Sequence, residues 1–380
     1  MKQIFILLLA LFFVEESISQ IVFDHYTPLP LSPQVYADFV YSDGDIAFED
    51  VNGNGFKDVI ITGLHATNQL VSKLYLNNGN GNFSEVTDTP FQGVNLSSIA
   101  FGDINGNGHA DLLITGQTMF SQRITKLYVN DGNGNFTEIT ETPFEGVRLG
   151  SVAFEDVDND GDLDVLIVGQ KTMGGLVANL YINDGNGNFT EASNTPFEGL
   201  IDGDMAFADV NGNGSMDVLI TGENSNDEKV TKLYINDGNG NFTEAINTPF
   251  VGVASSSIAF ADIDIDGDID IVISGLSNLG LITKLYINDG NGNFSENTES
   301  ELVGLSYCDI AFADIDSDGD QDLLISGRDN NLSGITKLYI NDGSGIFIEN
   351  TETELDQISH SNNHIFKSIP IYIFKSNVPI

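Results

Sequence analysis

The sequence predicts an all-β fold, a β-propeller of six complete four-stranded blades, and three observations lead to it. One pattern recurs six times along the chain, in steps of 53, 53, 53, 53 and 52 residues. Each copy holds four short β-prone segments without helical periodicity. The links between the segments are short and rich in glycine. Radial repetition of such sheets around an axis covers their apolar faces and edges, whereas a right-handed β-helix has shorter coils and suits the pattern less well.

In the second copy the four segments are residues 99–101, 111–115, 125–130 and 135–140. An Asn/Asp/Gly loop follows the first segment, a variable stretch follows the second, and a hairpin NDGNGN follows the third. Glycine supplies the positive φ angles that such hairpins need. The copy therefore predicts an antiparallel meander, and its second segment, apolar on both faces, is expected to lie between neighbouring blades.

The repeats define the domain organisation. We expect a signal peptide at 1–19, a propeller at 20–355 and an atypical tail at 356–380, with blades at about 42–93, 94–146, 147–199, 200–252, 253–304 and 305–355. Residues 21–29 resemble a degenerate outer strand, and 364–367 and 371–375 could pair as strands. The alternatives are a seventh, composite blade built from both termini, or six blades with a loose tail.

Composition narrows the cellular location and the partners. A basic Lys2, an apolar run at 4–14 and small residues near 17–19 predict a cleavable secretory signal, since the run is too short to span a bilayer. We expect a secreted or cell-surface protein without membrane insertion. The formal net charge of -42 excludes nucleic acid as a partner and favours cations. The single cysteine, Cys308, excludes an internal disulfide, which leaves metal as the candidate cross-link.

The Asn/Asp/Gly loop has the form D-x-[DN]-x-[DN]-G-x-x-D, and its positions 1, 3, 5, 7 and 9 are the candidate metal ligands. Loops 1 to 6 supply, in that order of positions, Asp50, Asn52, Asn54, Phe56 and Asp58; Asp103, Asn105, Asn107, His109 and Asp111; Asp156, Asp158, Asp160, Asp162 and Asp164; Asp209, Asn211, Asn213, Ser215 and Asp217; Asp262, Asp264, Asp266, Asp268 and Asp270; and Asp314, Asp316, Asp318, Asp320 and Asp322.

Oxygen side chains at positions 1, 3, 5 and 9, with a backbone carbonyl at position 7, can converge on one hard cation, and calcium is the natural occupant. An EF-hand is excluded because position 12 is isoleucine in all six loops instead of a bidentate glutamate. The alternative is that these residues only form turns. We predict about six calcium sites, tighter at the loops starting at Asp156, Asp262 and Asp314, which carry four carboxylates each.

The pattern AFxDVNGNGxxDVLITG followed by LYxNDGNGNF resembles the FG-GAP/VCBS repeats of integrin-α-like propellers over residues 46 to about 350. The resemblance implies a propeller with calcium in the loop between the first two strands of a blade, and a role in extracellular adhesion or ligand binding. Integrin-type propellers have seven blades, whereas six complete copies occur here.

The loops that differ between copies should share the face opposite the metal loops, which we call the variable face. Variable loops on a rigid scaffold often bind partners, and the candidate contacts there are Met119, Phe120, Arg123, Met173 and Arg328. We expect a module that binds an extracellular protein or matrix. The alternatives are a glycan-binding lectin, disfavoured because the chain has no Trp, a calcium-dependent polysaccharide lyase or hydrolase, and a structural spacer. The five scattered histidines match no catalytic constellation, so we expect no enzyme activity.

Overall fold

The structure, a computed structural model, describes residues 41–65, 67–80 and 82–351. This part of the chain forms strands β1 to β25 and one short 3-10 helix, η1 (Thr172–Gly174). It contains no helix that is long and apolar enough to cross a membrane. The predicted signal peptide, the tail 356–380 and the segments considered for a seventh blade lie outside the described residues.

The strands group into six blades, numbered in chain order, and each blade runs from an inner to an outer strand. The innermost strands are β2 (Ile46–Glu49), β6 (Asn95–Gly102), β10 (Val147–Glu155), β14 (Met205–Ala208), β18 (Val253–Ala261) and β22 (Ser306–Ala313). The second strands are β3 (Asp58–His65), β7 (Asp111–Gln117), β11 (Asp164–Lys171), β15 (Asp217–Glu223), β19 (Asp270–Ser277) and β23 (Asp322–Arg328).

The third strands are β4 (Leu70–Asn77), β8 (Arg123–Asn130), β12 (Leu176–Asn183), β16 (Lys229–Asn236), β20 (Gly280–Asn288) and β24 (Gly334–Asn341). The outer strands are β5 (Phe83–Glu85), β9 (Phe136–Ile139), β13 (Phe189–Glu191), β17 (Phe242–Glu244), β21 (Phe294–Asn297) and β25 (Phe347–Glu349). The short β1 (Tyr41–Ser42) adds to β3 in blade 1.

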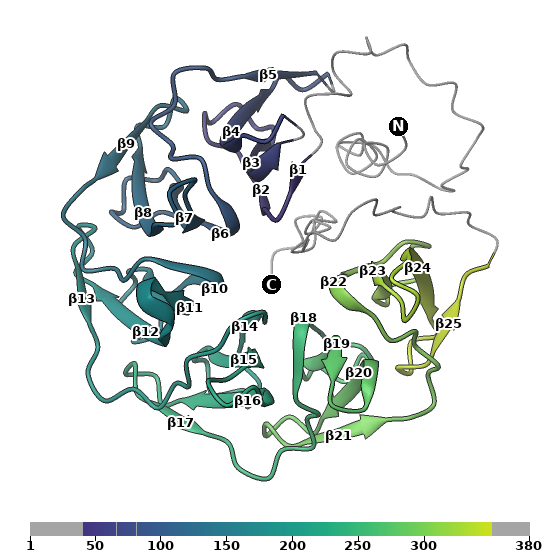
Figure 1. Ribbon diagram of the computed structural model, residues 1–380. Coiled ribbons are helices and arrows are strands. Elements are labelled where there is room, and N and C mark those ends of the chain that lie inside the picture. Colours follow the sequence, from purple (N-terminus) through teal and green to yellow (C-terminus); the bar gives the residue numbers. More distant parts are fainter. Residues whose placement is uncertain (1–40, 66, 81, 352–380) are drawn as a thin grey trace.

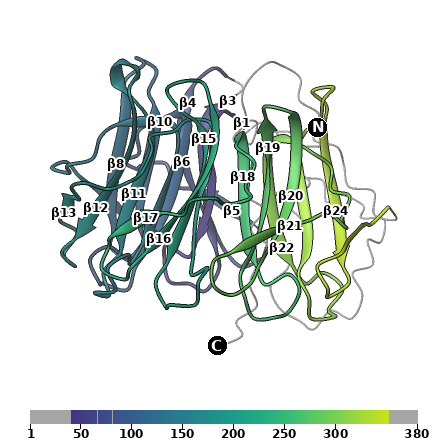
Figure 2. The same cartoon turned by 90° about the horizontal axis from the view of Figure 1, so that it is seen from below.

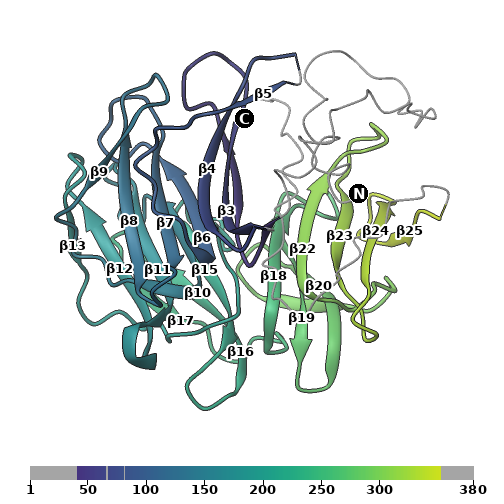
Figure 3. The same ribbon diagram turned by 45° about the horizontal axis from the view of Figure 1, so that its top comes forward.

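The blades lie side by side around a central axis, with β6, β10 and β18 near the axis and β5, β9, β13 and β21 at the rim (Figure 1). Apart from β1, which pairs with β3, the pairings within each blade join consecutive strands, and all of them are antiparallel. Seen from the side, the strands run between two faces of a disc (Figure 2), and the tilted view shows β22, β23, β24 and β25 in order from the centre of the ring towards its edge (Figure 3). The predicted all-β propeller of antiparallel meanders is confirmed.

The second strands form the centre of the core. In blade 2, Leu112, Leu113 and Ile114 are all fully buried, because one face of the strand meets the preceding blade and the other meets the next. Leu113 belongs to a cluster that also contains Val165 and Ile167 of blade 3. Burying each such side chain stabilises the fold by about 1.5–3 kcal/mol. Apolar packing between blades therefore holds the ring together.

The TPF motif at the end of each of the first four repeats anchors an aromatic contact. Phe144 meets the ring of Tyr181 edge-on at 5.0 Å between centroids, and it lies 5.1 Å from the ring of Phe189. The buried Tyr181 hydroxyl accepts a hydrogen bond from the Glu145 N–H at 3.2 Å. The same arrangement recurs around Tyr128, Tyr234 and Tyr286. The link between blades is thus tied to the blade that follows it.

Each blade places a residue in the left-handed region near the axis, where its inner strand begins. In blade 3 this residue is Leu149, at φ 51°, and a register shift between Arg148 and Ser151 marks a bulge there. The Leu149 carbonyl accepts a bond from the Asp202 N–H of blade 4 at 2.9 Å. Bulges re-aim neighbouring side chains, and Arg148 is one of those neighbours. The equivalent residues are Asp43, Leu96, Asp202, Ser255 and Tyr307.

Candidate functional site

The Asn/Asp/Gly loops, which the sequence predicts to bind metal and which we call the metal loops, connect the first and second strands of each blade. All six therefore lie on one face of the disc, together with the hairpins between third and fourth strands. Position 9 is the first residue of the second strand, and in loop 3 it is Asp164. Both of its carboxylate oxygens accept backbone hydrogen bonds, from Val157 at 3.1 Å and from Asn183 at 2.8 Å. Each of the six position-9 aspartates is almost fully buried and makes the same two bonds.

Position 1 organises the rest of the loop. The two oxygens of Asp156 accept bonds from the N–H groups of Asp160 at 3.1 Å and Gly161 at 3.0 Å. Gly161 has a φ of 96° and open space where a Cβ would stand, so backbone conformation rather than crowding selects glycine at position 6. The loop is folded around the carboxylate of position 1.

Three loops bring three carboxylates together. In loops 3, 5 and 6 the ligand atoms of positions 1, 3 and 9 lie within 4.8 Å of one another; the triads are Asp156, Asp158 and Asp164; Asp262, Asp264 and Asp270; and Asp314, Asp316 and Asp322. Position 5 is not part of a triad. Its side chain instead accepts a bond from the N–H of position 7, as Asp160 does from Asp162 at 3.0 Å.

The triads carry more negative charge than their hydrogen bonds satisfy. Burial raises the pKa of Asp164 to about 7, and the charges of Asp158 and Asp160 add to the rise. The pKa of Asp158 is also raised, mainly by burial and then by Asp160. One buried oxygen of Asp158, and the equivalent oxygen of Asp264, has no hydrogen-bond partner. A buried, partnerless carboxylate oxygen is costly unless a cation meets it.

The other three loops have asparagine at positions 3 and 5, and in two of them the position-3 amide donates to the position-9 carboxylate. In loop 2 the Asn105 side chain donates to the Asp111 carboxylate at 2.9 Å, and in loop 4 Asn211 donates to Asp217 at 3.2 Å. In loop 1 the position-5 amide of Asn54 donates to the Asn77 carbonyl at 3.0 Å. These loops therefore carry two carboxylates each and less unsatisfied charge.

The donor set of the triads fits a hard cation. Each triad offers three carboxylates, and oxygen ligands of this kind suit Ca²⁺ better than the imidazole- and thiolate-preferring transition metals. The buried oxygens of Asp158 and Asp264 that lack a donor are where such an ion would be met. Loops 3 and 5 enclose their triads more than loop 6, whose Asp314 and Asp316 are exposed.

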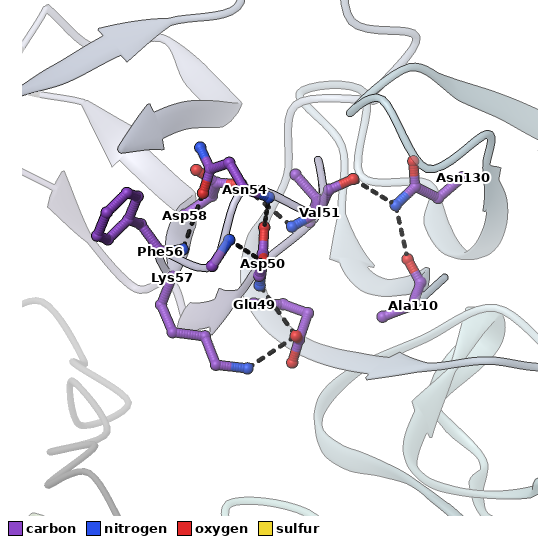
Figure 4. A network of polar contacts seen from close by, with 10 residues as sticks. Glu49, Asp50, Val51, Asn54, Phe56, Lys57, Asp58, Ala110 and Asn130 are labelled. Carbon is purple, nitrogen blue, oxygen red and sulfur yellow. Dashed lines mark hydrogen bonds and ion pairs between the residues drawn. The ribbon is translucent and has the colours of Figure 1, made fainter. Parts of the chain in front are cut away.

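An asparagine at the end of the third strand joins neighbouring loops. The Asn130 side-chain amide of blade 2 donates to the Val51 carbonyl in loop 1 at 2.9 Å and to the Ala110 carbonyl in its own loop at 3.1 Å (Figure 4). The bond to the preceding blade recurs at Asn183, Asn236, Asn288 and Asn341. We call these five residues the clasp asparagines. From the sequence alone, this asparagine is placed only in the hairpin turn. Its recurrence in every copy was the signal that could have indicated a role in joining the blades.

Position 7 lies against the hairpin of its own blade. A Cβ on Gly132 would stand 2.3 Å from the His109 ring, and one on Gly185 would stand 2.3 Å from the Asp162 carboxylate. The hairpin glycine is therefore required by close approach as well as by its positive φ. The other side chains at position 7 are Phe56, Ser215, Asp268 and Asp320.

On the variable face, the predicted contact residues divide into two kinds. Met119, Phe120 and Met173 are exposed by 62%, 92% and 101%. Arg123 is half-buried and donates to Gln170 at 3.0 Å. Arg328 is only 8% exposed and lies over the Tyr307 ring at 5.4 Å, so it differs from the exposed residues with which the sequence grouped it.

Comparisons with known proteins bear on the family and the fold. A family model described as an FG-GAP-like repeat matches residues 50–114, 119–167, 156–220 and 209–273, more than half of the chain. No curated protein sequence matches. Among solved structures, a triple arginine-to-alanine mutant of AofleA from Arthrobotrys oligospora is similar at a TM-score of 0.52 and 12% identity, over 86% of this chain and 90% of that one.

Two further structures are similar at lower scores. The exotype rhamnogalacturonan lyase YesX has a TM-score of 0.47 and 15% identity over 86% of this chain, which spans 56% of that lyase. The Aleuria aurantia lectin, a mutant in complex with alpha-methyl-L-fucoside, has a TM-score of 0.44 and 11% identity, over 83% of this chain and 96% of the lectin. At these identities the likeness concerns the fold alone.

Proposed function

The chain belongs to the FG-GAP-like repeat family, and from that premise we propose that it is a secreted, calcium-stabilised propeller that binds an extracellular protein or matrix partner through its variable face. The observation that carries the calcium part is the set of three carboxylate triads. Their buried, partnerless oxygens on Asp158 and Asp264 support occupation by a cation.

Calcium would neutralise the loops and add no reactive chemistry. In loop 3, Asp156, Asp158 and Asp164 would hold it, and Asp160 adds a fourth carboxylate close by. Asp164 also holds the end of the third strand through the Asn183 N–H. The ion would therefore fix the loop against the blade and, through the clasp asparagine, against the preceding blade.

Binding is a better account of the molecule than catalysis. Burial raises the pKa of the Cys308 thiol to about 12, so this residue is a poor nucleophile. His65 contacts Thr67, and His109 lies against Gly132; neither lies in a carboxylate triad. The exposed Met119, Phe120 and Met173 instead give the variable face an apolar surface that suits a partner.

The calcium part is tested by thermal unfolding of the chain without residues 1–19, in calcium, in magnesium and in chelator. Each site that is saturated a hundredfold above its dissociation constant should add about 2.7 kcal/mol. We expect a large rise of the melting temperature with calcium and a small one with magnesium. Equal melting temperatures in calcium and chelator would refute calcium stabilisation and leave the loops as turns.

A further inference from the structure

We propose that the variable face carries a binding site for a carboxylate-bearing peptide segment, built by Arg123 and Arg148 between blades 2 and 3. The inference deepens the proposed function, since it names the chemistry of the partner. It is independent of the calcium loops, which lie on the opposite face of the disc.

Four side chains from adjacent blades form the site, and we call them the Arg–Gln cluster: Gln117, Arg123, Arg148 and Gln170. Gln117 ends β7 and Arg123 begins β8, so both lie in blade 2 at the variable face. Arg148 lies on β10 at its bulge, opposite Gln170 of β11. The cluster thus bridges two blades at the end of the strands that is remote from the metal loops.

The two guanidinium groups share one neutral oxygen. Gln170 Oε1 lies 3.0 Å from Arg123 Nη2, 3.2 Å from Arg148 Nε and 3.0 Å from Arg148 Nη2. An amide oxygen has two lone pairs, so three donors from two cations exceed its capacity. Arg148 Nη1 donates in addition to Gln117 Oε1 at 2.5 Å. The neutral glutamines position the two arginines but do not neutralise them.

No carboxylate offsets this charge within the described residues. None lies within 4.0 Å of either arginine, whereas lysines such as Lys73 and Lys126 do pair with glutamates. Arg123 Nη1 is buried without a hydrogen-bond partner. Burial, and then the charge of Arg148, lower the pKa of Arg123. Two cations that share one neutral acceptor and have no carboxylate partner among the described residues are exceptional in a chain of net charge -42.

The cluster occurs in one place among the described blades. The positions equivalent to Arg148 are Ser42, Asn95, Ile201, Ala254 and Ser306, and those equivalent to Arg123 are Leu70, Leu176, Lys229, Leu281 and Gly334. The repeats are otherwise closely similar, so blade architecture does not require the arginine pair. A departure confined to one blade interface indicates a site rather than a structural element.

Exposed apolar side chains flank the cluster. Met119 and Phe120 lie in the loop between Gln117 and Arg123, and Met173 lies in the loop that follows Gln170. Methionine adapts to varied apolar side chains, whereas a sugar ring is usually held by an aromatic platform. With two methionines and one phenylalanine, this rim favours a peptide over a glycan. Arginine binds carboxylates in a bidentate manner, so the peptide should carry Asp or Glu beside apolar residues.

The test uses an array of short extended peptides in which one aspartate or glutamate stands among leucine, phenylalanine and methionine. Each peptide is paired with a copy that has asparagine or glutamine instead. Binding is measured by fluorescence anisotropy at physiological salt, where repulsion from the distant acidic loops is screened beyond about 8 Å. We expect the best acidic peptide to bind about tenfold or more tightly than its amide copy, because charge-assisted hydrogen bonds are lost in the copy.

Variants assign the effect to the cluster. Arg123→Gln and Arg148→Gln should each weaken the acidic peptide about tenfold and leave the amide copy unchanged. Lys73→Gln, which removes one positive charge from β4, is the matched control and should bind as the wild type. Unfolding curves of the variants identify any loss that comes from misfolding, and a conservative Arg148→Lys should then retain part of the affinity.

Three results would overturn the proposal. The first is equal binding of acidic and amide peptides across the array. The second is acidic binding that survives both arginine variants, and the third is arginine-dependent binding of an oligogalacturonate with no peptide binding, which would reassign the site to an acidic glycan. Repeating the titration in chelator separates this question from calcium. Peptide binding without a calcium effect on stability would refute the calcium proposal alone. A calcium effect on stability without peptide binding would refute the peptide site alone.

Discussion

At the scale of single residues, position 3 of the loop decides what meets the position-9 carboxylate in addition to its two backbone hydrogen bonds. In loops 2 and 4 an asparagine there donates to that carboxylate, as Asn105 does to Asp111. An aspartate there adds a third negative charge beside the first two, as Asp158 does. Replacing aspartate by asparagine at position 3 should therefore keep or raise the stability of the metal-free protein and weaken cation binding.

Asp158→Asn should convert loop 3 to the amide type. In chelator the variant should be at least as stable as the wild type, because one clustered charge is gone. In calcium it should lose up to about 2.7 kcal/mol of the stabilisation that a site saturated a hundredfold supplies. Denaturant unfolding with and without calcium measures both. The exposed Asp88→Asn makes the same charge change and should leave the calcium increment intact; an Asp158→Asn protein with the full increment would exclude loop 3 as a site.

At the scale of elements, the clasp asparagines connect the loops into a chain of contacts around the disc. Asn183 illustrates this: its amide donates to Ile104 of the preceding blade at 2.8 Å and to Leu163 of its own blade at 3.1 Å. Its backbone N–H is held by Asp164. A metal loop is thereby coupled to its neighbour by hydrogen bonds as well as by packing.

Removing a clasp should cost stability even in chelator. Asn183→Ala leaves two carbonyls without this donor, and we expect a loss of about 1–3 kcal/mol for unsatisfied buried groups. Asn186→Ala, at the exposed tip of the same hairpin, should stay within about 0.5 kcal/mol of the wild type. Urea unfolding monitored by circular dichroism measures the difference. Equal stability of the two variants would show that packing alone joins the blades.

Much of this element-level structure could be predicted from sequence, because strand, turn and loop signals are local. The apolar run around Ile114 predicted the buried second strand, and the Asp/Asn/Gly spacing predicted the loops that the structure describes. The clasp between Asn130 and Val51 could not be read in this way, since it joins residues 79 apart. The burial of Arg328 could not be predicted for a similar reason. Its partner Tyr307 comes from another strand, and the register between strands cannot be read from the sequence of one repeat.

At the scale of the whole molecule, acidity and fold are linked through the buried aspartates. Burial raises the pKa of Asp58, Asp111, Asp217 and Asp270 from 3.8 to about 6 and that of Asp164 to about 7. Exposed hairpin aspartates such as Asp131 have a lowered pKa, through hydrogen bonds from Asn135 and Asn133. The two groups act in opposite directions on stability as pH changes.

Stability without metal should fall as pH rises from about 4 to about 7. Over this range the folded protein binds more protons than the unfolded chain, because its buried aspartates have the higher pKa, so raising the pH favours unfolding. Below about 4 the exposed aspartates lose their stabilising bonds and the trend reverses. Chemical unfolding at a series of pH values in chelator checks this. Calcium should flatten the slope above pH 5, and a metal-free stability that increases towards pH 7 would contradict the predicted titration.

Isothermal titration of calcium into the metal-free protein is the most direct test of the central claim that the carboxylate loops are the principal calcium sites. We expect about six sites in two classes, with the tighter class at loops 3, 5 and 6. A variant carrying Asp158→Asn, Asp264→Asn and Asp316→Asn should lose the tighter class and keep the weaker one. Absence of calcium-dependent heat in the wild type, or an unchanged tight class in the triple variant, would contradict the account.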